Sequence, residues 1–461
     1  MTTHASNWKS LLSTHRLCGE ARNEISPARS PFQRDHDRIV FSGSFRRLQD
    51  KTQVFPLSKT DCVRTRLTHS LEASSIGRSL GTAAGAAICE TSDTGGLHPS
   101  DIGAIVAAAA LAHDIGNPPL GHAGEEAIQH WFTHSKIGQQ MRAEMLAASR
   151  ENEASDIEFF EGNAQGFRVL ARLEMPDRPG GMRLTCATLA AFAKYPRGSL
   201  AAARSPKKGK FNFFHSEREL FAEVAERAGM ISDGAQSWRR HPLAYLVEAA
   251  DDIAYRIVDF EDGHRLGFID FNELENQFLA IIGAERRGRY SSVLSSMSDP
   301  RRKAEFLRTQ TIGRLLDLCA KIFSASQPAL LDGEFEGVLL DHLEASVRDA
   351  LDAIAARSKT ALYQERSVVE VIAAGFELIS GMLDIFVPCV NELAFEAQGG
   401  AAASHRSKRL SALLPEPARD AADAAWRQSG YVRLQRILDY ISGMTDSFAV
   451  DLFQKLKGIS L

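Results

Sequence analysis

The sequence has few cysteines, and none of them belongs to a pair motif. The cysteines are scattered, with no C-x-x-C pair, at Cys18, Cys62, Cys89, Cys186, Cys319 and Cys389. A disulfide framework and a zinc ribbon both depend on a pattern of spaced cysteines. The scattered positions therefore argue against both and favour free thiols in a reducing cytoplasm.

The sequence also lacks a large excess of one charge and a long hydrophobic run. Its formal net charge is -4 over 461 residues, so any phosphate binding must come from local clusters of basic side chains. The longest apolar run that we identify, 102–112, is too short to cross a bilayer. No continuous apolar segment occurs in 1–19, so no signal peptide is expected. These absences predict a soluble cytoplasmic protein without a membrane partner.

The residues that are present favour a large helical core. Hydrophobic residues make up 44% of the chain and charged residues 24%, which is typical of a globular protein. Apolar residues recur at helical spacing through most of the chain, and no segment has the alternation of a long strand. The best strand candidates are the short pieces 51–56 and 211–214. The sequence therefore predicts an all-α fold.

The most informative segment follows a run rich in alanine and isoleucine, which should form a buried helix. His113 and Asp114 stand at the end of this run. Neighbouring residues on a helix differ by about 100° in direction, so this pair can approach one cation from two sides. The glycines and prolines of 116–121 then break the helix and bring His122 and Glu125 back towards it. By itself a His-Asp pair is more often a capped helix end with a solvated carboxylate.

Two other helix-like segments carry further candidates. Arg66 and His69 are one helical turn apart, so both can point to the same side. Asp251, Tyr255 and Asp259 are spaced i, i+4 and i+8, which predicts one shared helix face. Acids in an apolar helix are costly when they are buried without a partner, and a metal ion or a cationic ligand would supply one.

Together these motifs resemble the HD-domain superfamily, whose pattern is His, then His-Asp, then a distant Asp around one divalent metal. They are more closely similar to the deoxynucleoside triphosphate triphosphohydrolase family, which includes the bacterial dGTP triphosphohydrolases. The resemblance runs from about Arg34 to Gly263. It is carried by Arg38 with 45–54, by Arg66 and His69, by 113–125, by the Glu-Gly-Asn-Ala-Gln segment 161–165, by Lys210 and by 249–255.

The resemblance implies a role for each candidate side chain. It implies that one divalent metal ion is bound by His69, His113, Asp114 and Asp251. It assigns the proton at the scissile bond to His122 and Glu125. It implies that the substrate is bound by Gln53, Arg66, Lys210, Tyr255 and Asp259. The metal is expected to be magnesium or manganese, with other transition metals remaining open.

Several of these assignments have alternatives at the level of sequence. As a metal ligand, Asp251 is preferred to Asp252 because the family has this spacing between the ligand and Tyr255. Asp252 is expected to face another helix. Lys210 could be a surface lysine, and Tyr255 could be a buried tyrosine that donates to a neighbouring helix. Whether His122 acts as base or acid is left open.

The resemblance also implies how the chain is organised. It predicts an N-terminal arm at 1–37, an HD catalytic core at 38–270 and a helical C-terminal region at 271–461. The C-terminal region is expected to pack on the core and to make oligomer contacts. A homo-oligomer is expected, with a hexamer favoured by the resemblance.

The implied function is metal-dependent hydrolysis of deoxynucleoside triphosphates (dNTPs) to deoxynucleoside and tripolyphosphate. One alternative is an HD phosphohydrolase that acts on another nucleotide phosphate ester. Another alternative is a protein that binds nucleotides or single-stranded nucleic acid. The basic patches at 286–290 and 301–303 suggest this alternative. A dNTP activator and single-stranded nucleic acid are further candidate partners.

Overall fold

The computed structural model describes residues 7–19, 29–54, 64–203, 209–234 and 236–459. These residues are predominantly helical, and the prediction of an all-α fold is confirmed. The strands within them are β1 (Ser232–Gly234) and β2 (Ser237–Trp238), which form one short antiparallel pair. The cysteines among these residues are free thiols, and Cys62 lies outside the described residues.

The two predicted strand segments do not form strands. Thr52 makes a single bridge with Thr65, and Phe213 makes a single bridge with Gly198, but neither bridge extends into a ladder. Residues 55 and 56 of the first segment lie outside the described residues. Among the described residues of these segments, Val54, Phe211, Phe213 and Phe214 are nevertheless buried.

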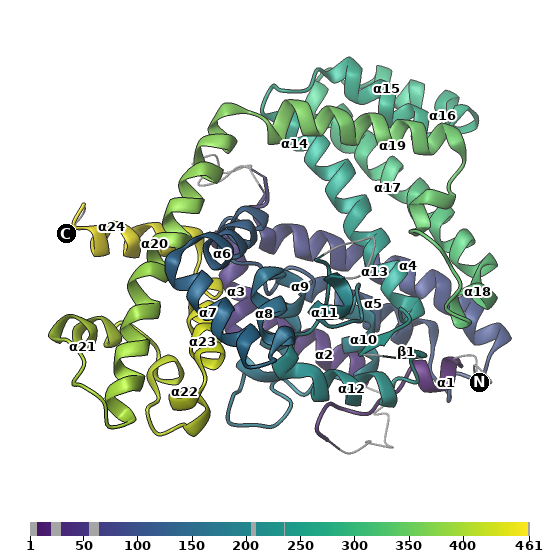
Figure 1. Ribbon diagram of the computed structural model, residues 1–461. Helices are drawn as coiled ribbons and strands as arrows, with labels where there is room; N and C mark the ends of the chain where they lie inside the picture. The colour runs from purple at the N-terminus through teal and green to yellow at the C-terminus, as the bar shows by residue number, and fades with distance from the viewer. Residues whose placement is uncertain (1–6, 20–28, 55–63, 204–208, 235, 460–461) are drawn as a thin grey trace.

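The helices follow one another with short connections (Figure 1). Those before residue 270 are α1 (Trp8–Leu11), α2 (Pro31–Val40), α3 (Gly43–Arg47), η1 (Leu48–Asp50), α4 (Arg66–Thr91), α5 (Pro99–Ala112), α6 (His122–His134), α7 (Lys136–Ala147), α8 (Glu151–Glu158), α9 (Gly162–Arg168), η2 (Val169–Leu173), α10 (Cys186–Phe192), α11 (Ser199–Ala203), η3 (His215–Glu217), α12 (Arg218–Arg227), α13 (Pro242–Ile253), η4 (Ala254–Val258) and α14 (Asp259–Arg265). Those after it are α15 (Phe271–Ile282), α16 (Ala284–Ser295), α17 (Pro300–Ala325), α18 (Gln327–Leu331), η5 (Leu339–His342), α19 (Ala345–Ser358), η6 (Lys359–Tyr363), α20 (Arg366–Ala397), α21 (His405–Ser411), η7 (Glu416–Arg419), α22 (Ala424–Gln428), α23 (Gly430–Ser442) and α24 (Asp446–Lys457).

The centre of the fold is the pair of helices α4 and α5. Helix α5 is buried from Asp101 to Ala112, as its alanine-rich sequence predicts. Small residues let the two backbones approach closely: a Cβ atom added at Gly81 would lie 2.9 Å from the Cα atom of Gly103. Helices α2, α10 and α13 pack against α5 as well. This packing fixes the C-terminal end of α5, where the His-Asp motif begins.

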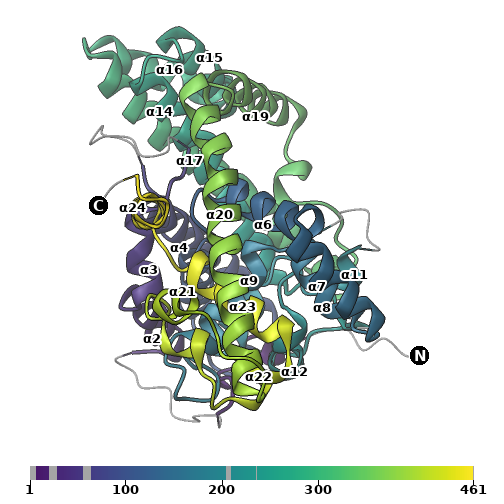
Figure 2. The ribbon, with the colours of Figure 1, turned by 60° about the vertical axis from the view of Figure 1, so that its left-hand side comes forward.

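The long helix α20 connects two parts of the molecule. Figures 1 and 2 show it running from the part that contains α14 to α19 towards α21 and α22. By length and composition residues Val368–Ala397 could cross a membrane, although the sequence had suggested no such segment. Half of that apolar window is buried inside the fold. The helix packs against α6, α21 and α23.

The apolar interior falls into two clusters of buried side chains. One surrounds α4, α5 and α13 and extends to α17 and α19. The other joins α6, α7 and α8 to α20 and α23. The second cluster therefore packs the C-terminal helices directly onto the segment that follows the His-Asp motif. The boundary predicted at residue 270 stays a prediction.

Candidate functional site

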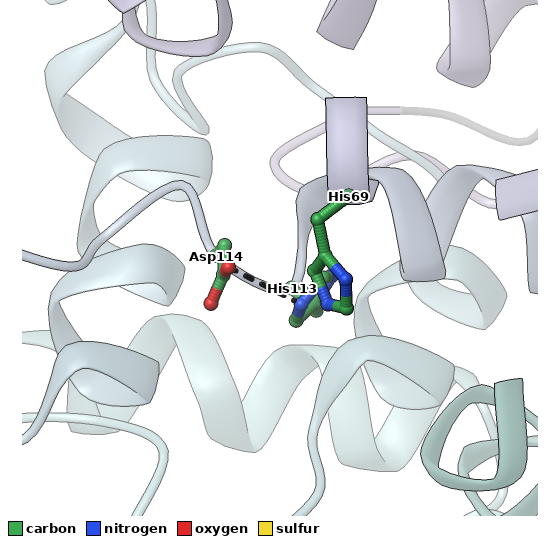
Figure 3. Close-up of side chains that lie close together, drawn as sticks. All are labelled: His69, His113 and Asp114. Carbon is green, nitrogen blue, oxygen red and sulfur yellow. Dashed lines mark ion pairs between the residues drawn. The ribbon is translucent and has the colours of Figure 1, made fainter. Parts of the chain in front are cut away.

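Four side chains from three helices meet at the C-terminal end of α5. His69 lies in the first turn of α4, His113 and Asp114 follow α5, and Asp251 lies near the end of α13. The ligand atoms of His69, His113 and Asp114 all lie within 4.8 Å of one another, and Figure 3 shows the three side chains grouped together. The Oδ1 atom of Asp251 is 3.2 Å from Nε2 of His69 and 3.5 Å from Nε2 of His113.

The hydrogen bonds around this group leave lone pairs for a cation. The Nδ1 atom of His113 lies 2.7 Å from the carbonyl oxygen of Ala110, to which it can donate, so its Nε2 atom is free to face the two carboxylates. Asp114 accepts from Arg66 at 2.8 Å and from the side-chain amide of Asn117. These contacts hold the imidazole and the carboxylate in fixed orientations, as the partners of metal ligands do.

The electrostatics of the group also favour a bound cation. Burial disfavours the charged imidazolium of His113, but Asp114 and Asp251 outweigh it and raise the pKa of His113 to about 9. Burial alone would raise the pKa of Asp251, yet His113 and Lys194 lower it below its usual range. The group therefore attracts a proton that a divalent cation would displace. Two imidazoles and two carboxylates fit such a cation, and the donor set suits magnesium, manganese or a borderline transition metal.

His122 and Glu125 form a second pair at the start of α6. The Nδ1 atom of His122 lies 2.9 Å from Oε2 of Glu125, and Oε1 of Glu125 accepts from the backbone of Gly162 at 2.8 Å. The imidazole is 76% exposed, whereas the carboxylate is buried. The hydrogen bond and the charge of Glu125 raise the pKa of His122. The carboxylate thus orients the imidazole and makes it more basic.

The loop before this pair has an unusual backbone. Leu120 and Gly121 have φ angles of 63° and 59°. A Cβ atom at residue 121 would overlap the guanidinium of Arg66, which explains the glycine in physical terms. Arg66 therefore lies between Asp114 and the loop that carries His122.

Two cavities open on the metal-ligand group. The first cavity has a volume of about 430 Å³, and its lining includes Gln53, Tyr255, Tyr363 and Ile372. The second cavity has a volume of about 210 Å³, and its lining includes Asn163, Lys194, Tyr195 and Lys210. Both are lined by Arg66, His113, Asp114, His122 and Asp251. The metal-ligand group therefore stands between a cavity that contains two tyrosine rings and a smaller cavity in which lysines and carboxylates are paired.

The second cavity contains lysines with different partners. Lys210 lies 2.7 Å from Oε2 of Glu161. Lys194 lies 3.5 Å from Asp251 and 3.6 Å from Glu248, and these neighbours raise its pKa against the effect of burial. Lys194 and Tyr195 were not selected from the sequence. A usable signal was present, because Lys194 follows the buried apolar helix α10 much as His113 follows α5.

Not all predicted substrate residues reach a cavity. Gln53 and Tyr255 line the first cavity and Lys210 the second, while Asp259 lines neither. Asp259 is buried and accepts a hydrogen bond of 3.2 Å from the hydroxyl of Tyr363, whose ring stacks on Tyr255. The π-helical turn η4, in which the helix takes up an extra residue, lies between Asp251 and Asp259, and the predicted role of Asp259 stays a prediction. Tyr363 was missed because its segment carries no motif.

The structure also bears on three residues that were weighed as supporting or alternative positions. Asp252 lines the first cavity, and burial raises its pKa to about 7; together with burial, its carboxylate also raises the pKa of Cys319 on α17, so the expectation that it faces another helix stays a prediction. Asn163 donates to Glu161 at 2.6 Å, and Gln165 donates to Asp439 at 2.9 Å. Gln53 is half-buried, and its Oε1 atom is buried without a hydrogen-bond partner among the described residues.

The C-terminal helices hold the segments that carry these residues. Asp446, at the start of α24, accepts from the backbone of Thr52 at 2.9 Å, from its hydroxyl at 2.5 Å and from the backbone of Leu120 at 2.9 Å. Lys51 donates to the carbonyl oxygens of Asn117 at 2.5 Å and Ser442 at 2.7 Å. We call Ser442 and Asp446 the C-terminal brace. It ties the segment before Gln53 to the loop before His122.

Comparison with known proteins gives matches over nearly the whole chain. Residues 66–161 match the HD domain, and residues 342–455 match the phosphohydrolase-associated domain. A deoxyguanosinetriphosphate triphosphohydrolase-like protein of Synechocystis is 41% identical over 98% of this chain and 100% of its own length. A protein of the same description from Pseudomonas aeruginosa is 39% identical over 98% and 99%. A deoxyguanosinetriphosphate triphosphohydrolase of Klebsiella pneumoniae is 30% identical over 93% and 94%.

Proposed function

The chain belongs to the HD-domain deoxyguanosinetriphosphate triphosphohydrolase family, and on that basis we propose that it hydrolyses dNTPs to deoxynucleoside and tripolyphosphate. The observation that carries this proposal is the position of the metal-ligand group between the first and second cavities. A bond placed at this group would have the sugar and base on the side of Tyr255 and the phosphates on the side of Lys194 and Lys210. Cleavage there separates a nucleoside from an intact chain of phosphates.

The side chains of the second cavity suit a triphosphate. Lys194 and Lys210 supply positive charge, and Tyr195 and Asn163 supply hydrogen-bond donors. Arg66, shared by both cavities, can hold the phosphate nearest the sugar while it keeps Asp114 in place at 2.8 Å. In the first cavity, Gln53 offers a free acceptor to a sugar hydroxyl, and Tyr255 offers a ring to the nucleoside.

We assign the transfer of the proton at the scissile bond to His122, with Glu125 as its hydrogen-bond partner. A divalent cation held by His69, His113, Asp114 and Asp251 would polarise a phosphoryl oxygen and lower the pKa of water. His122 lines both cavities and is exposed, so it can exchange a proton with water or with the leaving oxygen of the sugar. Glu125 stabilises the imidazolium in either role.

Product analysis tests this function directly. The protein is incubated with manganese or magnesium and each of the four dNTPs, and nucleoside is resolved from nucleotide. The expected products are deoxynucleoside and tripolyphosphate, which are lost in Asp251→Asn and retained in the surface control Asp451→Asn. Release of only phosphate or pyrophosphate from every dNTP would contradict the proposal. Greater activity on nucleoside monophosphates would favour another phosphate ester as the substrate.

The assembly and the partners are further parts of the proposal. We expect a homo-oligomer, and large apolar side chains at Phe41 and Phe395, which are 79% and 58% exposed, offer surface for contacts between copies. Light scattering after size exclusion would test this, since a single chain has a mass of 50.5 kDa. We also propose a cytoplasmic location and activation by a second dNTP. Comparing single dNTPs with mixtures in the same assay would test activation.

A further inference from the structure

Three of the carboxylates that line the second cavity have positive partners other than its lysines. Asp114 and Asp251 belong to the metal-ligand group, where a divalent cation would balance their charges. Glu248 accepts two hydrogen bonds from Arg240, at 2.6 Å and 3.1 Å. Each of these carboxylates therefore keeps a positive partner when a lysine of the cavity turns to a phosphate.

Glu161, the remaining carboxylate of the lining, has a single cationic partner among the described residues. This partner is Lys210, whose Nζ atom lies 2.7 Å from Oε2 of Glu161. The Oε1 atom accepts from the side-chain amide of Asn163 at 2.6 Å. Because Glu161 is only 2% exposed, water cannot take the place of Lys210. The charge of Glu161 thus depends on a lysine that the proposed reaction also needs.

The surroundings of Glu161 make its negative charge costly. Glu125 accepts from the backbone N–H of Gly162, the residue next to Glu161, at 2.8 Å. Burial and the negative charge of Glu125 raise the pKa of Glu161, and Lys210 offsets only part of this rise. A buried carboxylate without a cationic partner is unfavourable. Drawing Lys210 away from Glu161 therefore costs free energy.

A phosphate chain in the second cavity would share Lys210 with Glu161. The lysine ammonium has three donors on a flexible stem, so it can turn to a phosphate oxygen while it stays close to the carboxylate. Phosphate and carboxylate then bring their negative charges to the same lysine. Like charges a few ångströms apart inside a protein repel each other strongly. Glu161 therefore subtracts from the affinity that Lys210 contributes.

On the basis of the function proposed above, we propose that Glu161 limits the affinity of the second cavity for a phosphate chain by competing for Lys210. Substrate and product both carry this chain, so a cavity that binds one tightly binds the other tightly. With Lys210 unopposed, the cavity would retain tripolyphosphate after the nucleoside has left. Glu161 thus favours the release of tripolyphosphate and raises the KM of the substrate.

Calorimetry with tripolyphosphate tests the competition without hydrolysis. The protein is titrated in excess Mn²⁺, and the heat of titration into Mn²⁺ buffer alone is subtracted. Glu161→Gln keeps the shape of the side chain and an acceptor oxygen for Lys210 but removes the charge. It should lower the dissociation constant of tripolyphosphate about tenfold. The matched control is Glu158→Gln, which should leave the constant unchanged, because Glu158 pairs with Arg142 and does not line the cavity.

Two further measurements separate the effect of charge from an effect of shape. Glu161→Met removes both the charge and the acceptor, so it should also tighten tripolyphosphate binding, but less than Glu161→Gln, because Lys210 is no longer held in place. Deoxyguanosine carries no phosphate, and its affinity for Glu161→Gln and for the unmodified protein should agree within about twofold. If deoxyguanosine binding tightens as much as tripolyphosphate binding, the charge is not the cause and the proposal is overturned.

Lys194→Met shows whether tripolyphosphate occupies the second cavity. It should weaken tripolyphosphate binding about tenfold, because a cationic phosphate ligand is lost. Equal binding by Lys194→Met and the unmodified protein would refute both the phosphate site and the competition. Weaker or unchanged binding by Glu161→Gln, with the effect of Lys194→Met intact, would overturn the competition alone.

Product inhibition measures the same competition during hydrolysis. In Glu161→Gln, the inhibition constant of tripolyphosphate and the KM for a dNTP should both fall about tenfold, while kcat does not rise. The Mn²⁺ affinity of this variant should equal that of the unmodified protein, since Glu161 is not in the metal-ligand group. An unchanged inhibition constant would contradict the role of Glu161 in product release.

Discussion

Replacing Asp446 by asparagine should both destabilise the fold and slow hydrolysis. Asp446 is 2% exposed and accepts hydrogen bonds from Thr52 and Leu120 through both carboxylate oxygens. Asparagine keeps one acceptor oxygen and places an amide group where the other stood. At least one backbone N–H is then left without a partner, and the remaining bonds lose the carboxylate's charge.

The size of this effect follows from the number of bonds. A hydrogen bond to a charged group contributes roughly 1.5–3 kcal/mol, and an unpaired buried N–H costs roughly 1–3 kcal/mol. We therefore expect Asp446→Asn to lower the free energy of unfolding by about 2–4 kcal/mol. Because Thr52 precedes Gln53 and Leu120 lies two residues before His122, we also expect kcat/KM to fall about 10- to 100-fold.

Denaturation by guanidinium and dNTP hydrolysis measure the two effects. The matched control is Asp451→Asn on the same helix, where the carboxylate pairs with Lys455 and both side chains are 53% exposed. An exposed pair of this kind contributes about 0.5 kcal/mol or less, so the control should resemble the unmodified protein. If Asp446→Asn also stays within about 0.5 kcal/mol and keeps its kcat/KM, the C-terminal brace does not support the site as argued.

Three other predictions concern the site itself. Asp251→Asn should weaken Mn²⁺ binding about tenfold or more in calorimetry, because a carboxylate ligand is lost; unchanged affinity would remove Asp251 from the ligand set. Glu125→Gln removes the group that raises the pKa of His122. In the plot of kcat against pH, the limb that His122 controls should therefore move to lower pH. A move to higher pH would contradict the pairing of His122 with Glu125. Lys194→Met should raise the KM for a dNTP about tenfold, because a cationic phosphate ligand is lost. Its Mn²⁺ binding should stay equal or tighten, because the substitution removes a cation 3.5 Å from Asp251. Weaker Mn²⁺ binding would argue for a structural role.

The helical fold could be predicted from the sequence because it depends on local patterns, whereas the metal-ligand group was implied by the resemblance to the HD domain. The buried run before His113 favours a helix, and the glycines and prolines after Asp114 favour its end. The packing of α4 on α5, which brings His69 and His113 together, is not recorded in either segment alone. The close approach at Gly81 is consistent with the small residues seen along α4.

Other parts of the site depend on contacts that local patterns do not record. The π-helical turn η4 lies between Asp251 and Asp259, and a period of 3.6 residues does not anticipate such a turn. Asp446 accepts from Thr52 and Leu120, and the carbonyl oxygen of Ser442 accepts from the side chain of Lys51. These partners are far away in the chain, so no spacing marks Asp446 or Ser442. The strands β1 and β2 are too short to show an alternating pattern.

The C-terminal brace has a consequence for the order in which the protein becomes active during synthesis. Its hydrogen bonds join atoms that are 326 to 394 residues apart in the sequence. At roughly 5–20 residues per second, the ribosome adds Ser442 and Asp446 about 20 to 80 seconds after the residues that they hold. A nascent chain therefore carries all four metal ligands well before the loop to His122 is held in place. The proposed hydrolysis should begin only after the ribosome has added Asp446.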